Sequence, residues 1–384
     1  MHNYYFAECC LRIPEKNNFL SNSQLSYFRN KLSHCNKVVL NISSDACPAY
    51  ENLVNVSVGS GIIVGDIEGK KWLFSSDDKR NPCCIETSCD YSSLQGYINI
   101  TQCDDEHLLK ENFMQLLRIA TECHLAYNNG VSVHASCINF NEKAVLFAAP
   151  AGTGKSTQAN IWEKHMGAKI INGDRPFLHL FSEEVRAYGV PWDGKEQIFS
   201  QENYPVIAVV EVRRANSNNL RKMSEDQAFR LMMKQCFIPM WDDTLKFSVM
   251  KTIRLIAQKI PFYRLFCLPE ESATELLNKV LFTNQNSLLK KVQADMKLRE
   301  GFILKNIVDE WIVMPTGSNM KNFEGAIVLN DVSAFIWKQL EKPISRDDLL
   351  QVVLDEYDIN EQTAAADLDV LLEKLEGLGI LQKN

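Results

Sequence analysis

No stretch of this 384-residue chain is apolar over the length that a membrane-spanning helix needs. The first ten residues lack the basic region and apolar core of a secretory signal peptide. Basic residues are not in excess either, because 48 Asp and Glu outnumber 41 Lys and Arg. A nucleic-acid binder would usually carry a basic patch or domain. We therefore expect a cytoplasmic protein that binds neither a membrane nor a nucleic acid.

The twelve cysteines form no recognisable metal or redox motif. No Cys-x-x-Cys occurs, and no Cys and His residues are spaced as zinc ligands. Without a secretion signal, the expectation is reduced thiols in a reducing compartment. The group Cys83, Cys84 and Cys89 is the one that this expectation explains least well.

A hydrophobic content of 46% and a charged content of 23% are typical of a globular protein. The length suits about two or three domains. Short strand-like runs separated by Asn, Asp, Ser and Gly predict a β-rich N-terminal region over residues 1–110. A helical pattern at 106–127 leads into an α/β (α+β) domain over 111–282. A polar linker over 283–299 and a smaller domain over 300–384 complete the expected organisation.

The central motif is a phosphate-binding loop after a short apolar strand at residues 145–147. It follows the pattern G-x-x-x-x-G-K-[ST], except that Ala149 replaces the first Gly. Its glycines let backbone N–H groups approach a triphosphate, and the following helix directs its positive N-terminus to the same place. Lysine then binds the β- and γ-phosphates, and the Ser hydroxyl supplies an oxygen for Mg²⁺. The predicted nucleotide-binding residues are Ala151, Gly152, Thr153, Gly154, Lys155, Ser156 and Thr157.

Further candidate residues flank this loop on both sides. His134 lies on the strand-like stretch 131–140 before it, and a strand at 168–172 after it is followed by Asp174 and Arg175. An acid at such a strand end is where nucleotide-binding proteins place a Mg²⁺ ligand or a general base. The predicted metal ligands are thus Ser156 and Asp174. A lone strand histidine and a turn aspartate also occur for purely structural reasons.

The order of these features resembles the HPr kinase/phosphorylase family within the phosphoenolpyruvate carboxykinase-like superfamily. The matching stretches are 133–134, the loop at 149–157, the strand end at 170–175, and 188–195, which is similar to the segment Y-G-x-P-W-x-G-K. The resemblance covers about 1–282 and is most specific between 131 and 195. It implies ATP and Mg²⁺ as cofactors and a catalytic set of His134, Asp174, Arg175, Asp193 and Lys195.

This sequence departs from the family at one position. The family has two adjacent acids at the strand end that share base and metal duties, whereas this chain has Gly173 before Asp174. Either Asp174 performs both tasks, or Asp193 or His134 replaces the second acid, or catalysis is weak or lost.

Residues 300–384 resemble PqqD, the small peptide-binding protein of pyrroloquinoline quinone biosynthesis. The resemblance lies in the stretch 325–330, a helix around 332–337 and the terminal stretch 375–381. It implies a winged-helix-like domain of three strands and three helices that binds the leader of a ribosomally made precursor peptide by strand addition. The implied peptide-binding residues are Ala326, Ile327, Val328, Leu329, Leu368, Leu371 and Leu372.

Together these features predict an ATP-dependent kinase that acts on a Ser or other hydroxyl of a precursor peptide captured by the C-terminal domain. A second hypothesis is a catalytically degenerate, nucleotide-binding peptide chaperone for a partner modification enzyme. A third is a small-molecule kinase with a regulatory C-terminal domain.

Overall fold

The structure is a computed structural model that describes residues 2–7, 9–13, 24–28, 36–43, 47–59, 61–75, 83–98, 105–150, 152–192, 198, 200–283, 296–317 and 326–383. Contacts divide the chain into two units, Met1–Lys290 and Lys291–Asn384, which are described separately. The mixed α/β architecture with a β-rich N-terminal part agrees with the sequence prediction.

The N-terminal part of the first unit is an eight-stranded mixed sheet in the order β1-β2-β3-β8-β7-β6-β5-β4. β2, β3 and β8 are parallel neighbours, whereas the remaining pairs are antiparallel. Two short 3-10 helices, Gln24–Phe28 and Tyr50–Asn52, lie between strands. The strands are β1 (His2–Phe6), β2 (Cys9–Ile13), β3 (Asn36–Ser43), β4 (Val54–Gly59), β5 (Ile62–Ile67), β6 (Lys70–Ser75), β7 (Cys83–Thr87) and β8 (Ser93–Ile98).

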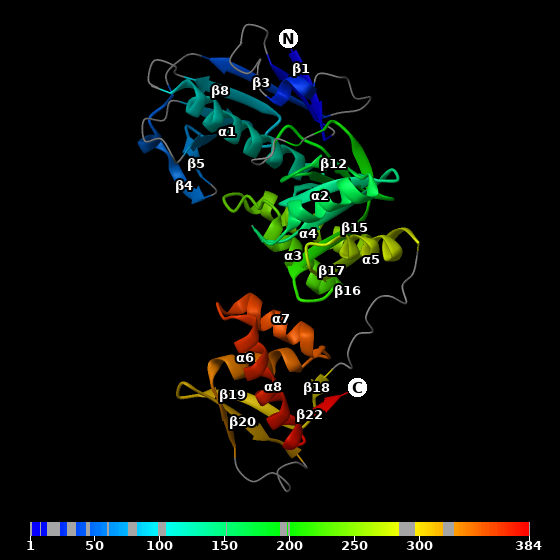
Figure 1. Cartoon of the computed structure of the whole chain (residues 1–384). Coiled ribbons are helices and arrows are strands. Elements are labelled where there is room, and N and C mark those ends of the chain that lie inside the picture. The colour runs from blue at the N-terminus through cyan, green and yellow to red at the C-terminus, as the bar shows by residue number, and fades with distance from the viewer. Residues whose placement is uncertain are drawn as a thin grey trace. The chain divides into compact units, whose positions relative to one another are not determined.

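Helix α1 (Glu106–Tyr127) packs along this sheet, as Figure 1 shows. It begins at the side chain of Asp105, which accepts hydrogen bonds from the backbone N–H groups of His107 and Leu108. Most of its apolar residues recur at helical spacing and are buried. One hydrophobic core contains residues of the eight-stranded sheet, of α1 and of the sheet that follows. The β-rich part and the loop-bearing part therefore share one interior.

The second sheet has nine strands, with the path β12-β10-β11-β15-β14-β13-β9 and with β17 and β16 joined beyond β15. β11 and β15 are parallel, as are β15 and β17. The strands are β9 (Gly130–Ser132), β10 (Ala135–Phe140), β11 (Lys143–Ala148), β12 (Lys169–Asn172), β13 (Phe177–Leu180), β14 (Val185–Tyr188), β15 (Asn203–Arg214), β16 (Asn219–Lys222) and β17 (Phe262–Cys267).

Strand β11 carries the chain into the phosphate-binding loop and is buried on both faces. Ala144, Leu146 and Ala148 face the core shared with α1, whereas Val145 and Phe147 face a second core. Such continuous apolar sequence is typical of a strand that is covered on both sides.

Helices cover both faces of this sheet. Buried residues of α3 (Glu225–Gln235) and α4 (Asp243–Lys259) belong to the core that contains α1, and buried residues of α2 (Lys155–Met166) and α5 (Glu271–Phe282) belong to the second core. Trp162 of α2 is fully buried in the second core. Helix α2 ends at Gly167, whose φ of 70° is the left-handed conformation that glycine accepts readily.

The stretch 131–140, predicted as one strand, is two. β9 ends at Ser132 and pairs with β13, whereas β10 begins at Ala135 and pairs with β11 and β12. Between them, the backbone N–H of His134 donates to the carbonyl oxygen of Gln235 at 2.8 Å. The break turns the chain from one part of the sheet to another and leaves His134 outside the strand ladder.

The second unit contains a three-stranded antiparallel sheet, β19 (Phe302–Ile307), β20 (Glu310–Pro315) and β21 (Ile327–Leu329), in that order. Helices α6 (Asp331–Leu340), α7 (Arg346–Glu356) and α8 (Glu361–Gly377) follow, as Figure 1 shows. The expected three strands and three helices are present. Two further strands, β18 (Met296–Leu298) and β22 (Leu381–Lys383), pair with each other, and β18 lies inside the stretch expected as a linker.

Each helix of this unit begins at a polar residue that caps its first turn. Asn330, Ser345 and Asn360 accept hydrogen bonds from backbone N–H groups three residues later. A paired contact joins α7 to α8, because Arg346 donates from Nε and Nη2 to the two carboxylate oxygens of Asp369, each at 2.6 Å. Within the ranges given above, no helix is both long enough and apolar enough to cross a membrane.

Candidate active site

The phosphate-binding loop joins the end of β11 to the start of α2. Gly152 and Gly154 have φ angles of 76° and 114°, a region that residues with a Cβ atom rarely adopt. Ala149 is fully buried and is not among the residues with positive φ. Its methyl group packs in the core with Trp162 of α2, so alanine fits where the motif usually has glycine. Within the described part of the loop, the backbone geometry therefore requires glycine at Gly152 and Gly154.

Lys155 points back into the loop. Its side chain is buried, and its Nζ atom donates to the carbonyl oxygens of Ala149 at 2.8 Å and Pro150 at 3.3 Å. Burial lowers the pKa of Lys155, and the negative charge of Asp174 opposes that shift. The loop lysine and the strand-end acid therefore lie within electrostatic range of each other.

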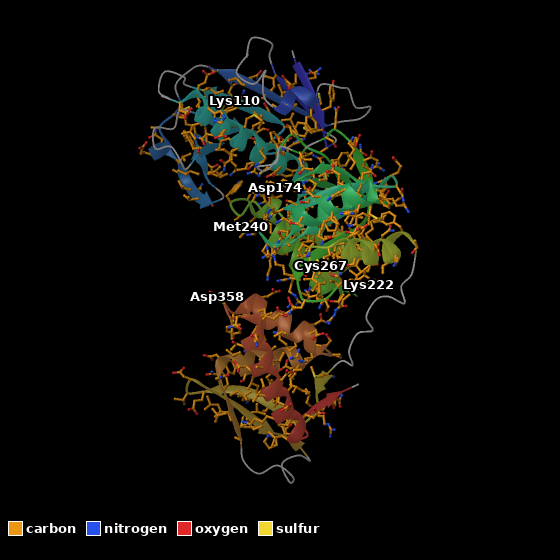
Figure 2. All side chains as sticks on the ribbon, viewed as in Figure 1. Lys110, Asp174, Lys222, Met240, Cys267 and Asp358 are labelled. Carbon is orange, nitrogen blue, oxygen red and sulfur yellow. The ribbon has the colours of Figure 1, made fainter. Side chains whose placement is uncertain are left out.

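Asp174 lies in the turn after β12 and is labelled in Figure 2. The Nε2 atom of His134 is 3.3 Å from its Oδ1 atom, and the Nε atom of Arg175 is 3.7 Å from its Oδ2 atom. The hydrogen bond from His134 is the largest cause that lowers the pKa of Asp174, and the charges of Arg175 and Lys155 lower it further. Asp174 is thus a carboxylate at neutral pH. Three predicted catalytic residues meet here, beside the predicted loop lysine.

Asn172 holds this turn in place and was not predicted as a site residue. Its side chain is fully buried, and its Oδ1 atom accepts from the backbone N–H groups of Asp174 at 3.1 Å and Arg175 at 2.7 Å. Its Nδ2 atom donates to the carbonyl oxygens of Val190 at 3.3 Å and Trp192 at 3.0 Å. One amide therefore fixes both the acidic turn and the segment with the Y-G-x-P-W pattern. A buried Asn at the end of an apolar strand is the sequence signal that could have identified it.

Three arginines and an acid beside the loop were also missed. Glu211 of β15 pairs in register with Ala148 at the end of β11 and is buried. Arg213 and Arg264 donate to its two carboxylate oxygens at 2.9 and 2.6 Å. Arg214, the last residue of β15, donates from Nη2 to the carbonyl oxygen of Gly152 at 2.5 Å. The available signal was the apolar run 206–210, which is followed by Glu211 and, after Val212, by the basic pair Arg213 and Arg214.

The remaining predicted nucleotide-binding residues lie at the loop and the first turn of α2. Thr153 donates from its hydroxyl to the carbonyl oxygen of Pro150 at 2.7 Å. Ser156 is half-buried and Thr157 is exposed. Ala151, Asp193 and Lys195 lie outside the described residues.

Side chains beside the phosphate-binding loop offer oxygen ligands for a cation. No group of three His, Cys, Asp or Glu side chains is close enough to form a metal site in the described part of the chain. Mg²⁺ needs no such cage, because it binds through one or two protein oxygens, phosphate oxygens and water. The ionised carboxylate of Asp174 and the hydroxyl of Ser156 are ligands of the kind that Mg²⁺ prefers.

The predicted peptide-binding residues divide by exposure. Leu329, Leu368 and Leu372 belong to the core of the second unit, and Ile327 and Leu371 are half-buried at its edge. Val328 is 58% exposed, and Ala326 is also exposed. Strand β21 is the last of its sheet, so within the described chain it has no strand beyond it. Val370 of α8 was not predicted, and it is an exposed apolar residue as well.

The family model described as Coenzyme PQQ synthesis protein D (PqqD) matches residues 310–381. The second unit therefore contains a PqqD domain, in agreement with the sequence resemblance. A comparison with curated proteins gave no match.

Three solved structures are similar to parts of the chain. TbiB1 in complex with the TbiA(beta) leader peptide is 21% identical, with a TM-score of 0.20, and the alignment covers 22% of this chain and 94% of that one. Lasso peptide synthetase B1 complexed with the leader peptide is 22% identical, with a TM-score of 0.20 and coverage of 23% and 99%. The Hpr(Ser) kinase/phosphatase from Coxiella burnetii is 12% identical, with a TM-score of 0.24 and coverage of 41% and 96%.

Proposed function

We propose that this protein is an ATP-dependent kinase that phosphorylates a Ser or another hydroxyl of a ribosomally synthesised precursor peptide. The observation that carries the proposal is that Lys155 of the phosphate-binding loop lies near the ionised carboxylate of Asp174. The charge of each group shifts the pKa of the other. A phosphate site alone would need only the loop. A carboxylate beside it supplies what a phosphoryl transfer to a hydroxyl also needs.

The proposed chemistry assigns a task to each group. The peptide hydroxyl oxygen attacks the γ-phosphorus of ATP, its proton passes to the carboxylate of Asp174, and the bond between the γ-phosphorus and the β,γ-bridging oxygen breaks, so that ADP leaves. His134 holds the carboxylate through its Oδ1 atom. Arg175 and the loop amides stabilise the negative charge that spreads over the transferred group.

Lys155 changes partners in this scheme. Its Nζ atom now donates to two carbonyl oxygens of its own loop. When ATP binds, phosphate oxygens would replace these neutral acceptors, and hydrogen bonds between charged groups are stronger than those to carbonyls.

Ser156 and Asp174 are the residues that would hold Mg²⁺. The ion, when bound, neutralises charge on the β- and γ-phosphates. The low pKa of Asp174 suits this role, because the carboxylate needs no proton loss to accept a cation. The same low pKa makes Asp174 a weak base, so its contribution to proton transfer depends on position more than on basicity.

The PqqD domain would recruit the peptide. A peptide strand added beside β21 would use backbone hydrogen bonds for affinity and would place alternate side chains next to Val328. A peptide captured in this way reaches an effective concentration of about 1 mM for a site on the same chain. A partner modification enzyme would then receive the phosphorylated peptide.

Incubation with ATP, Mg²⁺ and a candidate precursor peptide, followed by mass spectrometry, tests the proposal. The gain of one phosphate on the peptide is the expected result. ATP binding without any product would refute the kinase and would leave a nucleotide-binding peptide chaperone for a partner enzyme. Gly173 favours that second candidate, because only one acid follows β12. Equal activity on a free small alcohol with residues 300–384 deleted would instead support a small-molecule kinase.

A further inference from the structure

Two cysteine thiols lie together on the N-terminal sheet. The Sγ atom of Cys47 donates to the carbonyl oxygen of Tyr97 at 3.7 Å. Tyr97 of β8 is the register partner of Cys84 on β7. Cys47 also packs against a small apolar cluster that contains Leu53, Trp72 and Cys84. A hydrogen bond with the Cys84 thiol lowers the pKa of Cys47. Cys47 therefore lies over the strand pair that contains Cys84.

The two thiols differ in access and in acidity. Cys47 is half-buried, whereas Cys84 is fully buried. The hydrogen bond from Cys84 is the largest effect on Cys47 and lowers its pKa, and burial raises the pKa of Cys84. A thiolate is the reactive form of cysteine, so Cys47 is both the more accessible and the more nucleophilic member of the pair.

We propose that Cys47 is an oxidation site for hydroperoxides and that Cys84 is its resolving thiol, so that the pair forms a reversible disulfide. This inference is independent of the proposed kinase activity. It assigns a role to part of the cysteine group that the sequence alone left unexplained, and it pairs Cys84 with a residue far from that group in the sequence.

The reaction proceeds in two balanced steps. The Cys47 thiolate attacks one peroxide oxygen, the O–O bond breaks, and the alkoxide or hydroxide that leaves takes up a proton to give ROH or water. Cys47 is then a sulfenic acid. The Cys84 sulfur loses its proton and attacks the Cys47 sulfur, the S–O bond breaks, and water leaves. Overall, two thiols are oxidised to a disulfide and one hydroperoxide is reduced to ROH and water.

The neighbouring cysteines do not have this arrangement. Cys83 precedes Cys84 on the strand and its side chain belongs to the large core on the other face of the sheet. Cys89 is exposed in the turn after β7. Cys89→Ser is therefore a matched control, since it removes the most accessible thiol of the sequence cluster without touching the pair.

The test is treatment of the full-length chain with a small excess of H₂O₂, followed by alkylation, non-reducing digestion and mass spectrometry. The expected product is a peptide pair linked through Cys47 and Cys84, lighter than the two free peptides by two hydrogens and restored by dithiothreitol. Cys47→Ser should abolish the linked pair, and Cys89→Ser should leave it unchanged. In Cys84→Ala, Cys47 should accumulate as sulfenic acid, trapped by dimedone.

A second measurement does not depend on whether the buried variant Cys84→Ala folds. The disulfide closes a loop that contains β4, β5 and β6, so oxidised wild type should melt higher than reduced wild type by about 5 °C. Cys47→Ser should show no such difference while its reduced melting temperature stays close to wild type. The proposal is wrong if Cys47→Ser still yields a disulfide at Cys84, or if oxidised wild type carries only sulfinic or sulfonic acid at Cys47.

Discussion

The Nε2 atom of His134 lies 3.3 Å from the Oδ1 atom of Asp174, although one residue precedes the phosphate-binding loop and the other follows the helix after it. The break between β9 and β10 makes this contact possible, because it frees His134 from the strand ladder. The backbone N–H of Ala135 also donates to the carbonyl oxygen of Asp174 at 2.9 Å. His134 and Ala135, at the break before β10, therefore hold the side chain and the backbone of Asp174 in place.

Replacing His134 should raise the pKa of Asp174. In His134→Ala, the largest cause of the low value is lost, because alanine has no side-chain donor, and the pKa should move toward the ordinary value. A depressed carboxylate pKa stabilises the fold above the unfolded-state pKa, and this stability is lost as pH falls through the folded-state pKa. Through this effect, the free energy of unfolding of wild type should exceed that of the variant by about 1 kcal/mol or less near pH 6, because Asp174 is partly exposed. This contribution should vanish in strong acid, where Asp174 is protonated in both the folded and the unfolded state.

Urea unfolding of both proteins between pH 2.5 and 7, extrapolated linearly to zero denaturant, would measure this difference. His165→Ala is a suitable control, because His165 also contacts an acid, Glu271, at 3.2 Å but lies at the other end of α2. A constant gap between wild type and His134→Ala across the whole pH range would contradict the assignment.

Lys155→Ala should reduce ATP-dependent phosphate transfer by about 100-fold or more, because it removes a charge that stabilises the transferred phosphoryl group. Peptide affinity should stay within about twofold of wild type, since the PqqD domain is a separate unit. Lys164→Ala, an exposed lysine on the same helix, provides the control. Full activity in Lys155→Ala would remove the loop from the mechanism. Product formation by mass spectrometry and peptide binding by fluorescence anisotropy supply the two readings.

Asn172→Ala should lower the free energy of unfolding by about 2–4 kcal/mol, because it leaves buried backbone groups at Asp174 and Arg175 without their acceptor. Asn172→Asp keeps that acceptor but places a carboxylate against the carbonyl oxygens of Val190 and Trp192. Both variants should lose phosphate transfer at temperatures where circular dichroism shows them folded. Retained transfer in either one would show that the turn needs no such support.

Val328→Lys should weaken binding of a precursor peptide by about tenfold or more if the peptide pairs with β21. Val328 is exposed, so the change should alter the melting temperature little. Val308→Lys is the matched control, because Val308 is 90% exposed on the same sheet but lies in the turn between β19 and β20. Isothermal titration with the peptide would separate the two variants, and equal affinities would place the peptide elsewhere.

The turn between β19 and β20 offers a stabilising change. Val308 and Asp309 have φ angles of 51° and 65°, which suit a type I′ turn and disfavour a β-branched residue. The double change Val308→Asn with Asp309→Gly should raise the free energy of unfolding of the second unit by about 1 kcal/mol. Thermal melting of residues 291–384 within the full chain would report it. A lower melting temperature would mean that Val308 makes contacts that outweigh its backbone strain.

Sequence patterns predicted the elements whose periodicity is complete. The helical spacing of α1 and the doubly buried run of β11 were readable because most apolar residues of each pattern are buried in the core. Strands β13, β14 and β16 were missed, since each has four residues and mixes polar with apolar side chains. The side chains of β13 and β14 gain burial only from strands distant in the sequence, and no local pattern records that.

The candidate site was predictable where one motif contains the chemistry. Gly152, Gly154 and Lys155 follow from the loop pattern, and Asp174 follows from its place after a strand. Asn172 and Glu211 were missed, because their roles depend on which backbone groups and arginines the fold brings to them. Spacing along the chain carries no information about such partners.

The interior that α1 shares with both sheets of the first unit has a consequence for cooperativity. Because both sheets contribute side chains to one hydrophobic core, unfolding either sheet would expose that core. The eight-stranded sheet and the sheet that carries the loop should therefore unfold in one transition. A fragment that begins after residue 110 would lack the eight-stranded sheet and would expose to solvent the apolar side chains of α1 that pack against it. Such a fragment should aggregate. Heat or a protease that unfolds the N-terminal strands would therefore also unfold the phosphate-binding loop, although these strands lie far before the loop in the sequence.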